Sequence, residues 1–558
     1  MSTLRTTTLE DIDTGFSVDI VDLLLMDTLS DESDPLKGAA GIGRAGQVVT
    51  SIANLRLLSK DSASKYAFAV GYYASGDGGG GPYYLDAADT TSADNSGTII
   101  VAADGGRWKL ASTRLVSLKQ FGARGDNSTN DTAAVAAAVA YIAATGLSVE
   151  VPSGTFLSDP ITLNIASGNL QGSFIGVDRQ RSILKRRVAG ASAFFTIGGL
   201  ASTSYQTGGG MSDLTIDGGV NTNGPAFLGY DLVRTVFDNV HFQGGFAGVQ
   251  LKGGISVAFN DCLVDQAQYG YHIDKYPGIV PGEFSPAGGG WPNIIRIRGG
   301  EVVDNSVWGI WFNNGRMLLL NENEVEGNGT TLGAAQGGVY IGADVGAEVA
   351  TTDALSIGLV ATGCWFEGNR GAADLVFDGG INTVEASTHF SNSSSVTNAV
   401  AIAGGQYYLI NPNFSQAMTL QVSEGAGVST GNIIQSSNLS TYSVNFDKTT
   451  VNANNTTQVR GGQVPAVPNL AKPLIQAGTN NTGAGGTTVN FPIPFLVGTV
   501  PVVTPTVNNG DSTTTLTQIV ISSVTNTGFF ARGLQLTSGS STIAQANLGF
   551  NYQAVGTK

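Results

Sequence analysis

The chain has 558 residues, more than one ordinary hydrophobic core accommodates, so we expect several domains. Glycine accounts for 77 residues and only 13% are charged, which is typical of many short strands joined by tight turns. The net charge of −15 argues against a nucleic-acid partner, because phosphate binding requires a basic surface. We expect no standard export signal, because the N-terminus lacks a basic region followed by an apolar one. We also expect no membrane insertion, because no apolar run approaches the roughly 18 residues of a membrane span.

The cysteine and histidine content bounds the possible metal chemistry. Cys262 and Cys364 lie far apart in apolar, strand-like sequence, so we predict two buried free thiols, with a disulfide as the alternative. Two cysteines and three histidines make a structural zinc site improbable. We therefore expect neither a metal nor another cofactor.

Two segments precede the first predicted helix. Residues 1–35 are polar and acidic around a short apolar run, and we interpret them as an attachment segment. Residues 36–114 are predicted to form a small mixed domain. Its glycine-rich run at 76–81 lacks the Gly-Lys-Ser/Thr ending of a phosphate-binding loop and lies between tyrosine-rich strands. A long hairpin loop is the expected structure there.

A single helix is predicted next. Asn130 or Asp131 can cap its start, valine and isoleucine side chains fall on one face, and Gly146 ends it. A strand follows at 148–152. The predicted helix thus stands alone before a long series of strands.

The motifs FGARGDNSTNDTAAV and GLSVEVPSGTF, within 121–156, resemble the start of the pectate-lyase-like parallel β-helix of phage tailspikes and capsule depolymerases. In that family one helix caps the open end of the stack of coils. The preceding GYYASGDGGGG and DGGRWKL are similar to the small domain that often comes before it. The resemblance implies an all-β fold, a right-handed parallel β-helix with three strands per coil, over residues 115–460.

An internal repeat supports the same architecture independently of the resemblance. Segments with the pattern apolar, any, apolar, polar recur from LTIDGG to PNFSQA, mostly 22 to 26 residues apart. Two longer intervals, of 39 and 41 residues, contain the insertions 275–293 and 329–353. Further strands before and after each repeat give three strands per coil. The predicted inward column is Ile216, Phe242, Val264, Val303, Val325, Phe366, Phe390 and Phe414.

Two outward rows follow from this register, because alternate residues of a strand point to opposite faces. The row after the inward column is Asp217, Gln243, Asp265, Asp304, Glu326, Glu367, Ser391 and Ser415. The row before it is His241, Leu263, Val302, Glu324, Trp365, His389 and Asn413. This register leaves Glu301 at an inward position beside Val240 and Cys262, which is unfavourable for a carboxylate.

The row of acids suggests a glycosidase, which needs one protonated carboxyl group and one carboxylate. We predict catalytic roles for Asp304, Glu326 and Glu367, with support from Asp265 and Glu324. The alternative is that these outward acids are only solvated residues before turns. The predicted substrate-binding residues are Trp365, Trp308, Trp311, Tyr340, Trp291, Arg296 and Arg298.

A proline-containing linker opens the last segment, and residues 461–558 are predicted to form a β-sandwich. The pattern resembles the small module that trimerises the ends of phage fibres and sometimes binds sugar. It implies a C3 homotrimer.

The resemblance implies a phage tailspike, made in the host cytoplasm, carried on the virion and acting at the bacterial surface. Its N-terminus would attach to the phage tail or an adaptor protein. The leading hypothesis is an endo-acting glycoside hydrolase that depolymerises a capsule, exopolysaccharide or O-antigen. A polysaccharide lyase acting by β-elimination, a non-catalytic receptor-binding spike and an O-acetyl esterase remain as alternatives.

Overall fold

The structure is a computed structural model that divides the chain into two compact units, residues 1–463 and 464–558. No described helix is long and apolar enough to cross a membrane. The described residues are 8–11, 16–19, 46–62, 64–111, 115–165, 170–199, 205–219, 223–275, 291–342, 357–385, 388–391, 396–410, 412–414, 419–423, 432–435, 443–447, 457–460, 473–482, 485–491, 500–507, 515–537, 544–546 and 548–557.

A five-stranded sheet forms the small N-terminal domain. Its order is β3 (Gln47–Val49), β4 (Tyr66–Ala69), β5 (Gly81–Leu85), β7 (Arg107–Leu110) and β6 (Ile99–Val101), beside the short helix α2 (Ile52–Leu55). Strands β4 and β5 pair antiparallel, so the glycine-rich run joins a hairpin as predicted. The Asp77 carboxylate fixes that loop, because it accepts hydrogen bonds from four backbone N–H groups within residues 72–79. Farther toward the N-terminus, β1 (Thr8–Asp11) and β2 (Phe16–Asp19) pair antiparallel.

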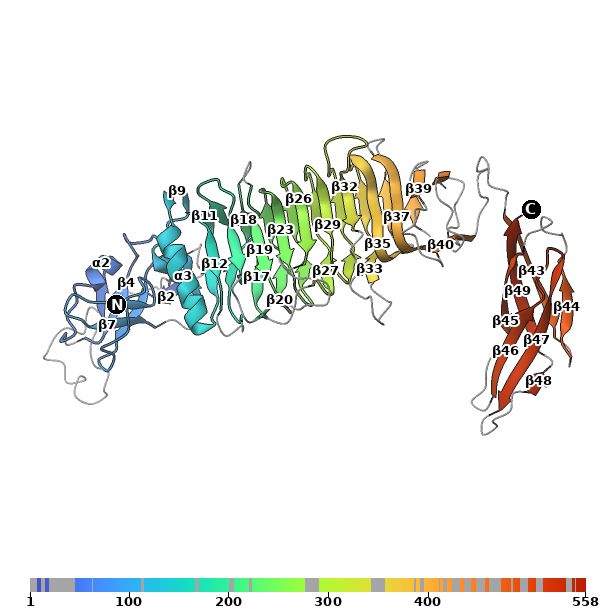
Figure 1. Cartoon of the computed structure of the whole chain (residues 1–558). Helices are drawn as coiled ribbons and strands as arrows, with labels where there is room; N and C mark the ends of the chain where they lie inside the picture. Colours follow the sequence, from blue (N-terminus) through green and yellow to red (C-terminus); the bar gives the residue numbers. More distant parts are fainter. Residues whose placement is uncertain are drawn as a thin grey trace, which may run out of the picture. The chain divides into compact units, whose positions relative to one another are not determined.

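The predicted helix is α3 (Thr132–Thr145), preceded by the 3-10 helix η2 (Leu118–Phe121). Asp131 precedes α3, but its carboxylate accepts from the backbone N–H groups of Arg124 and Gly125 and does not cap the helix. Gly146, with a φ of 70°, ends the helix as predicted. The helix buries Ala134, Val135, Ala138 and Ile142 at the first coil of the β-helix, as the family resemblance implies (Figure 1).

Three parallel sheets form the β-helix that follows (Figure 1). Sheet 1 consists of β9 (Asp126–Asn130), β11 (Gly154–Ser158), β14 (Ser182–Arg186), β18 (Thr215–Asp217), β22 (His241–Gln243), β25 (Leu263–Asp265), β28 (Glu301–Val303), β31 (Glu324–Glu326), β34 (Trp365–Glu367), β36 (His389–Ser391) and β38 (Asn413–Phe414). Sheet 2 consists of β12 (Ile161–Leu163), β15 (Phe195–Ile197), β19 (Phe227–Tyr230), β23 (Ala247–Lys252), β26 (Tyr269–Asp274), β29 (Trp308–Phe312) and β32 (Gly337–Ile341).

Sheet 3 completes each coil and consists of β8 (Val116–Ser117), β10 (Val149–Val151), β13 (Phe174–Gly176), β17 (Gly210–Ser212), β21 (Val236–Asp238), β24 (Ala258–Asn260), β27 (Ile295–Arg298), β30 (Leu318–Asn321) and β33 (Ile357–Thr362). Two long strands, β35 (Gly371–Val384) and β37 (Val396–Ile410), then run through sheets 2 and 3 together. The last paired strands are β39 (Thr419–Ser423), β40 (Asn432–Gln435), β41 (Ser443–Asp447) and β42 (Thr457–Arg460), and a side pair is formed by β16 (Gln206–Thr207) and β20 (Leu232–Val233). The predicted parallel β-helix with three strands per coil is confirmed.

The interior of the coils is apolar, because every sheet 1 strand from β11 to β36 turns its middle residue inward. Buried middle residues include Phe242, Val264 and Phe366. Aromatic rings stack along the axis, with Phe366 and Phe390 5.0 Å apart between ring centroids. Cys262 and Cys364 are buried free thiols, as predicted.

One coil departs from the predicted register by a single residue. Val302, not Val303, pairs with the inward residues Val264 and Val325, and Val302 is buried. Val303 therefore lies in the outward row, and Glu301 pairs with Leu263 and Glu324 in the other outward row. The predicted inward place of Glu301 is wrong, and the corrected register removes a buried charge.

The C-terminal unit is a β-sandwich, as predicted. One antiparallel sheet has the order β43 (Pro473–Asn481), β49 (Gly549–Thr557) and β45 (Val502–Val507). The other has the order β44 (Thr487–Asn490), β47 (Gly528–Thr537) and β46 (Thr515–Ser522), with β48 (Ala544–Ala546) on β47. Both sheets contribute to one core, in which Phe529 and Tyr552 have ring centroids 5.0 Å apart.

Candidate functional site

Four carboxylates gather on the outward face of sheet 1. Glu301 pairs in register with Glu324, and Glu326 pairs with Glu367 on the following strand. Glu324 and Glu326 project from the same strand, β31, on the same face because they are two residues apart. Strands in a sheet lie about 4.8 Å apart, so these side chains are immediate neighbours. We call Glu301, Glu324, Glu326 and Glu367 the acid cluster.

Within the acid cluster, Glu324 holds its proton more tightly than an isolated glutamate does. Burial raises the pKa of Glu324, and a hydrogen bond with the Glu326 side chain raises it further. The negative charges of Glu326, Glu301 and Glu367 act in the same direction. Glu324 is therefore the member best suited to carry a proton, with Glu326 as its partner.

Trp365 fixes the position of a different carboxylate. Its indole Nε1–H donates a 2.7 Å hydrogen bond to Oε2 of Glu367. The Trp365 ring is 42% exposed and stacks on His389 with 4.0 Å between ring centroids. Burial lowers the pKa of His389, with the Glu367 charge opposing that effect. Glu367 is thus held by a rigid aromatic donor on the face that also presents Glu324.

The acid cluster brings together carboxyl groups of the kind that glycoside hydrolysis uses. A glycosidase pairs a protonated carboxyl group with a carboxylate about 5 to 9.5 Å away, the shorter separations giving retention and the longer ones inversion. Neighbouring strands lie about 4.8 Å apart and residues two apart on one strand roughly 6.6 Å, so the Cα atoms of Glu324, Glu326 and Glu367 lie within about 8 Å of one another. The raised pKa of Glu324 favours its protonated form, and Glu326 and Glu367 lie beside it.

The structure does not place Asp304 in the outward row. Asp304 follows strand β28, is exposed and has a φ of 53°, in the turn that leaves sheet 1. The equivalent turn positions on the next two coils are glycines, Gly327 and Gly368, with φ values of 65° and 60°. Aspartate tolerates this left-handed conformation better than most residues, which accounts for its presence there. The expected alignment of Asp304 with Glu326 and Glu367 is therefore wrong.

Asp265 is in the outward row, as predicted, but it has a partner of its own. His241 Nε2 lies 2.9 Å from Oδ1 of Asp265 across neighbouring strands. Val303 separates Asp265 from Glu326 along the row. Asp265 therefore belongs to a histidine pair beside the acid cluster.

The predicted aromatic residues lie on different sheets. Trp311 and Tyr340 stack on the outward face of sheet 2, with ring centroids 4.0 Å apart, and the Tyr340 hydroxyl donates to Asp378. Trp308 on the same sheet is only 2% exposed, and its ring centroid lies 5.5 Å from that of Tyr340. Trp291 is buried, and the Lys275 ammonium lies 5.3 Å from its ring centroid.

The predicted arginines lie apart from those aromatics. Arg296 and Arg298 are exposed on β27 in sheet 3. Of the seven predicted binding residues, only Trp365 lies on the sheet that carries the acid cluster.

Glu301 was not predicted as an outward residue. A signal was available, because Glu301–Asn305 (EVVDN) aligns with Glu324–Asn328 (EVEGN) when their asparagines are matched. Those asparagines are buried and hydrogen-bonded to each other, so their register is fixed.

Among the described residues, no group of three or more His, Cys, Asp or Glu could hold a metal ion.

One family model matches the chain. Residues 48–113 match the phage tail protein small four-stranded beta-sheet domain, in the region of the five-stranded sheet described above. This part of the chain is therefore similar to a phage tail domain. A domain of this kind followed by a parallel β-helix is the arrangement that the resemblance to β-helical tailspikes predicts.

Several solved structures are similar to the chain at low identity. The tailspike gp49 of Acinetobacter baumannii bacteriophage Fri1, a capsular polysaccharide depolymerase, is 14% identical with a TM-score of 0.39, covering 91% of this chain and 98% of its own. The gp42 tailspike of Acinetobacter phage vb_AbaP_AS12 is 12% identical with a TM-score of 0.47, covering 90% and 92%. The enzymatically active domain of tailspike protein 2 of bacteriophage CBA120 is 13% identical with a TM-score of 0.45, covering 96% and 85%. These scores assign no activity to the chain. No curated protein sequence matches it.

Proposed function

We propose that this chain is a tailspike on the phage virion that binds and depolymerises a bacterial surface polysaccharide as an endo-acting glycoside hydrolase. The observation that carries the proposal is the pair Glu324 and Glu326, whose shared hydrogen bond and burial raise the pKa of Glu324. Glu324 is the general acid. Glu367, which Trp365 holds in place, is the base or nucleophile, and Glu326 raises the pKa of Glu324.

Three further features support action on a polymer at a cell surface. Glu301 and Trp365 are exposed on the outward face of sheet 1, so a long polymer can reach the acid cluster. The phage tail domain at 48–113 supports attachment to the phage tail or an adaptor protein through the N-terminal part. The C-terminal sandwich would hold three copies together, in line with the fibre modules that its sequence resembles.

The products distinguish this proposal from its alternatives. The protein is incubated with purified capsular polysaccharides, exopolysaccharides and O-antigens from candidate hosts, and the products are sized and assayed. New reducing ends without an unsaturated uronate support the hydrolase. One ultraviolet-absorbing unsaturated end for each new reducing end would instead identify a lyase. Tight binding of one of these polymers without shortening it would identify a non-catalytic spike.

A further inference from the structure

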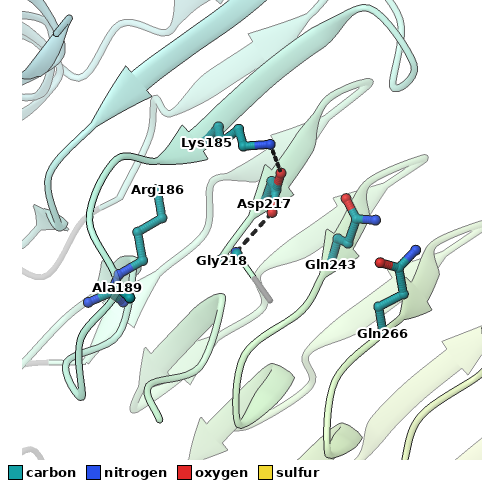
Figure 2. A pocket seen from close by; sticks show the side chains of 8 residues that line it. Lys185, Arg186, Ala189, Asp217, Gly218, Gln243 and Gln266 are labelled. Atoms are coloured by element: carbon teal, nitrogen blue, oxygen red, sulfur yellow. Dashed lines mark hydrogen bonds and ion pairs between the residues drawn. The ribbon is translucent and has the colours of Figure 1, made fainter. Parts of the chain in front are cut away.

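A polar cavity of about 360 Å³ lies on the outward side of sheet 1, several coils before the acid cluster (Figure 2). Its walls are Lys185, Arg186, Ala189, Asp217, Gly218, Gly219, Gln243 and Gln266. This volume is within the range of small-molecule binding sites. The cavity is separate from the acid cluster, and none of the predicted site residues lines it.

The cavity lies along the outward row of sheet 1 that also contains Glu326. Lys185, Asp217 and Gln243 pair in register on successive strands, and the row continues through Asp265 and Val303 to Glu326. Four strand spacings of about 4.8 Å separate Asp217 from Glu326, a distance of roughly 19 Å. A polymer lying along the row would therefore touch both places with different sugar residues.

Two amide side chains in the cavity are available to a ligand. Figure 2 shows Gln243 and Gln266 side by side at its edge, and neither side chain has a hydrogen-bonding partner among the described residues. Each amide offers two donors and an acceptor. Gln266 has a φ of 55°, an unusual conformation for glutamine, in the turn that follows β25.

The charged groups of the cavity already have partners, which bears on the chemistry of the ligand. Lys185 Nζ lies 3.1 Å from Oδ2 of Asp217, and Oδ1 of Asp217 accepts from the backbone N–H of Gly219. The Arg186 guanidinium donates to the carbonyl oxygens of Val188 and Ser192. Asp217 therefore offsets the charge of Lys185, and backbone carbonyls occupy the Arg186 donors without neutralising its charge. The lysine–aspartate pair and the two glutamine amides suit a group that both donates and accepts hydrogen bonds, as the hydroxyls of a neutral sugar do.

We infer that this cavity is a remote subsite for a neutral sugar residue of the polysaccharide, held by Gln243 and Gln266 with the Lys185–Asp217 pair. The inference rests on the proposed function for its link to catalysis. Binding energy gained at such a distance is available only to a substrate long enough to span both places. The enzyme should therefore favour polymers over short fragments of the same polysaccharide.

The first test compares the double variant Gln243→Ala/Gln266→Ala with Gln268→Ala, an exposed glutamine outside the cavity on the same coil. For a polysaccharide that the wild type cleaves, loss of these hydrogen bonds should raise KM roughly tenfold in the double variant with kcat unchanged. KM for fragments too short to span the row should be unchanged, and Gln268→Ala should match the wild type. An unchanged KM for the polymer in the double variant would overturn the inference.

A second test does not depend on catalysis. Saturation-transfer NMR with glucose, galactose and N-acetylglucosamine should give signals with the wild type and with Gln268→Ala that disappear in the double variant. Signals that persist in the double variant, no signal with the wild type, or a stronger signal with glucuronate would each overturn the neutral-sugar subsite. If the wild type cleaves no polymer but these signals depend on the two glutamines, the hydrolase proposal fails and the subsite stands.

Discussion

A buried carboxyl group at the end of an asparagine ladder makes the stability of the β-helix depend on pH. Asn305, Asn328 and Asn369 are buried on successive coils and bond side chain to side chain, at 2.9 Å and 3.0 Å. Asn369 Nδ2 then donates a 2.8 Å hydrogen bond to Oδ1 of Asp374, on β35. Asp374 is 1% exposed, and its Oδ2 has no partner among the described residues.

Burial raises the pKa of Asp374 to about 7, although the hydrogen bond from Asn369 works in the opposite direction. The ordinary value is 3.8. Below pH 3.8 the group is protonated in both the folded and the unfolded chain. Between pH 3.8 and 7 only the unfolded chain releases the proton, so the stability of the folded state falls as pH rises. At 1.36 kcal/mol per pKa unit, the total loss is about 4 kcal/mol.

The substitution Asp374→Asn removes this ionisation and keeps an acceptor for Asn369. The free energy of unfolding of the variant should exceed that of the wild type by an amount that grows from pH 4 to pH 7, to about 4 kcal/mol, and then levels off. Calorimetric melting temperatures from pH 4 to 8.5 measure this difference. Asp304→Asn, which replaces an exposed aspartate, serves as the control and should track the wild type. Wild-type and Asp374→Asn curves that stay parallel over this range would refute the reasoning.

Three further predictions concern the acid cluster and the ladder. Trp365→Phe keeps an aromatic ring but removes the indole N–H that donates to Glu367. We expect kcat to fall roughly tenfold to a hundredfold with little change in melting temperature. Unchanged kinetics would show that this hydrogen bond does not position the carboxylate. Glu301→Gln removes a negative charge that raises the pKa of Glu324, so the alkaline limb of the pH–rate profile should move to lower pH. An alkaline limb that stays in place or moves to higher pH would contradict the role of Glu324 as the general acid. Asn328→Ala leaves the hydrogen-bonding groups of the neighbouring buried asparagines unpaired, so the free energy of unfolding should fall by about 2 to 4 kcal/mol. Calorimetry measures this change. A melting temperature equal to that of the wild type would contradict the structural role of the ladder.

The repeat in the sequence was sufficient to predict the β-helix, because each coil needs an inward apolar residue and a turn at a nearly constant spacing. The same repeat was ambiguous at residues 301–303, where two adjacent valines both fit the inward position. The interval before this coil contains an insertion, so spacing alone could not choose between them. The structure chooses Val302, since the buried asparagines fix the turn that follows.

The candidate site was predictable only in part for the same reason. Glu324, Glu326 and Glu367 were placed in the correct rows, because their strands are unambiguous. Asp304 was misplaced by the one-residue error, and Glu301 was placed inside the coil. The bond from Trp365 to Glu367 depends on side-chain conformations that a repeat pattern does not encode.

Counting reducing ends tests most directly whether the acid cluster cleaves a bacterial polysaccharide by hydrolysis. Reducing ends released from a polysaccharide that the wild type cleaves are counted for Glu324→Gln, Glu326→Gln, Glu367→Gln and the control Asp304→Asn, with melting temperatures confirming that each variant is folded. We expect Glu324→Gln and at least one of the other two glutamine variants to lose activity by a factor of roughly a hundred or more, and Asp304→Asn to keep it. Full activity in all three glutamine variants, or its loss in Asp304→Asn alone, would contradict the assignment of the acid cluster as the catalytic site.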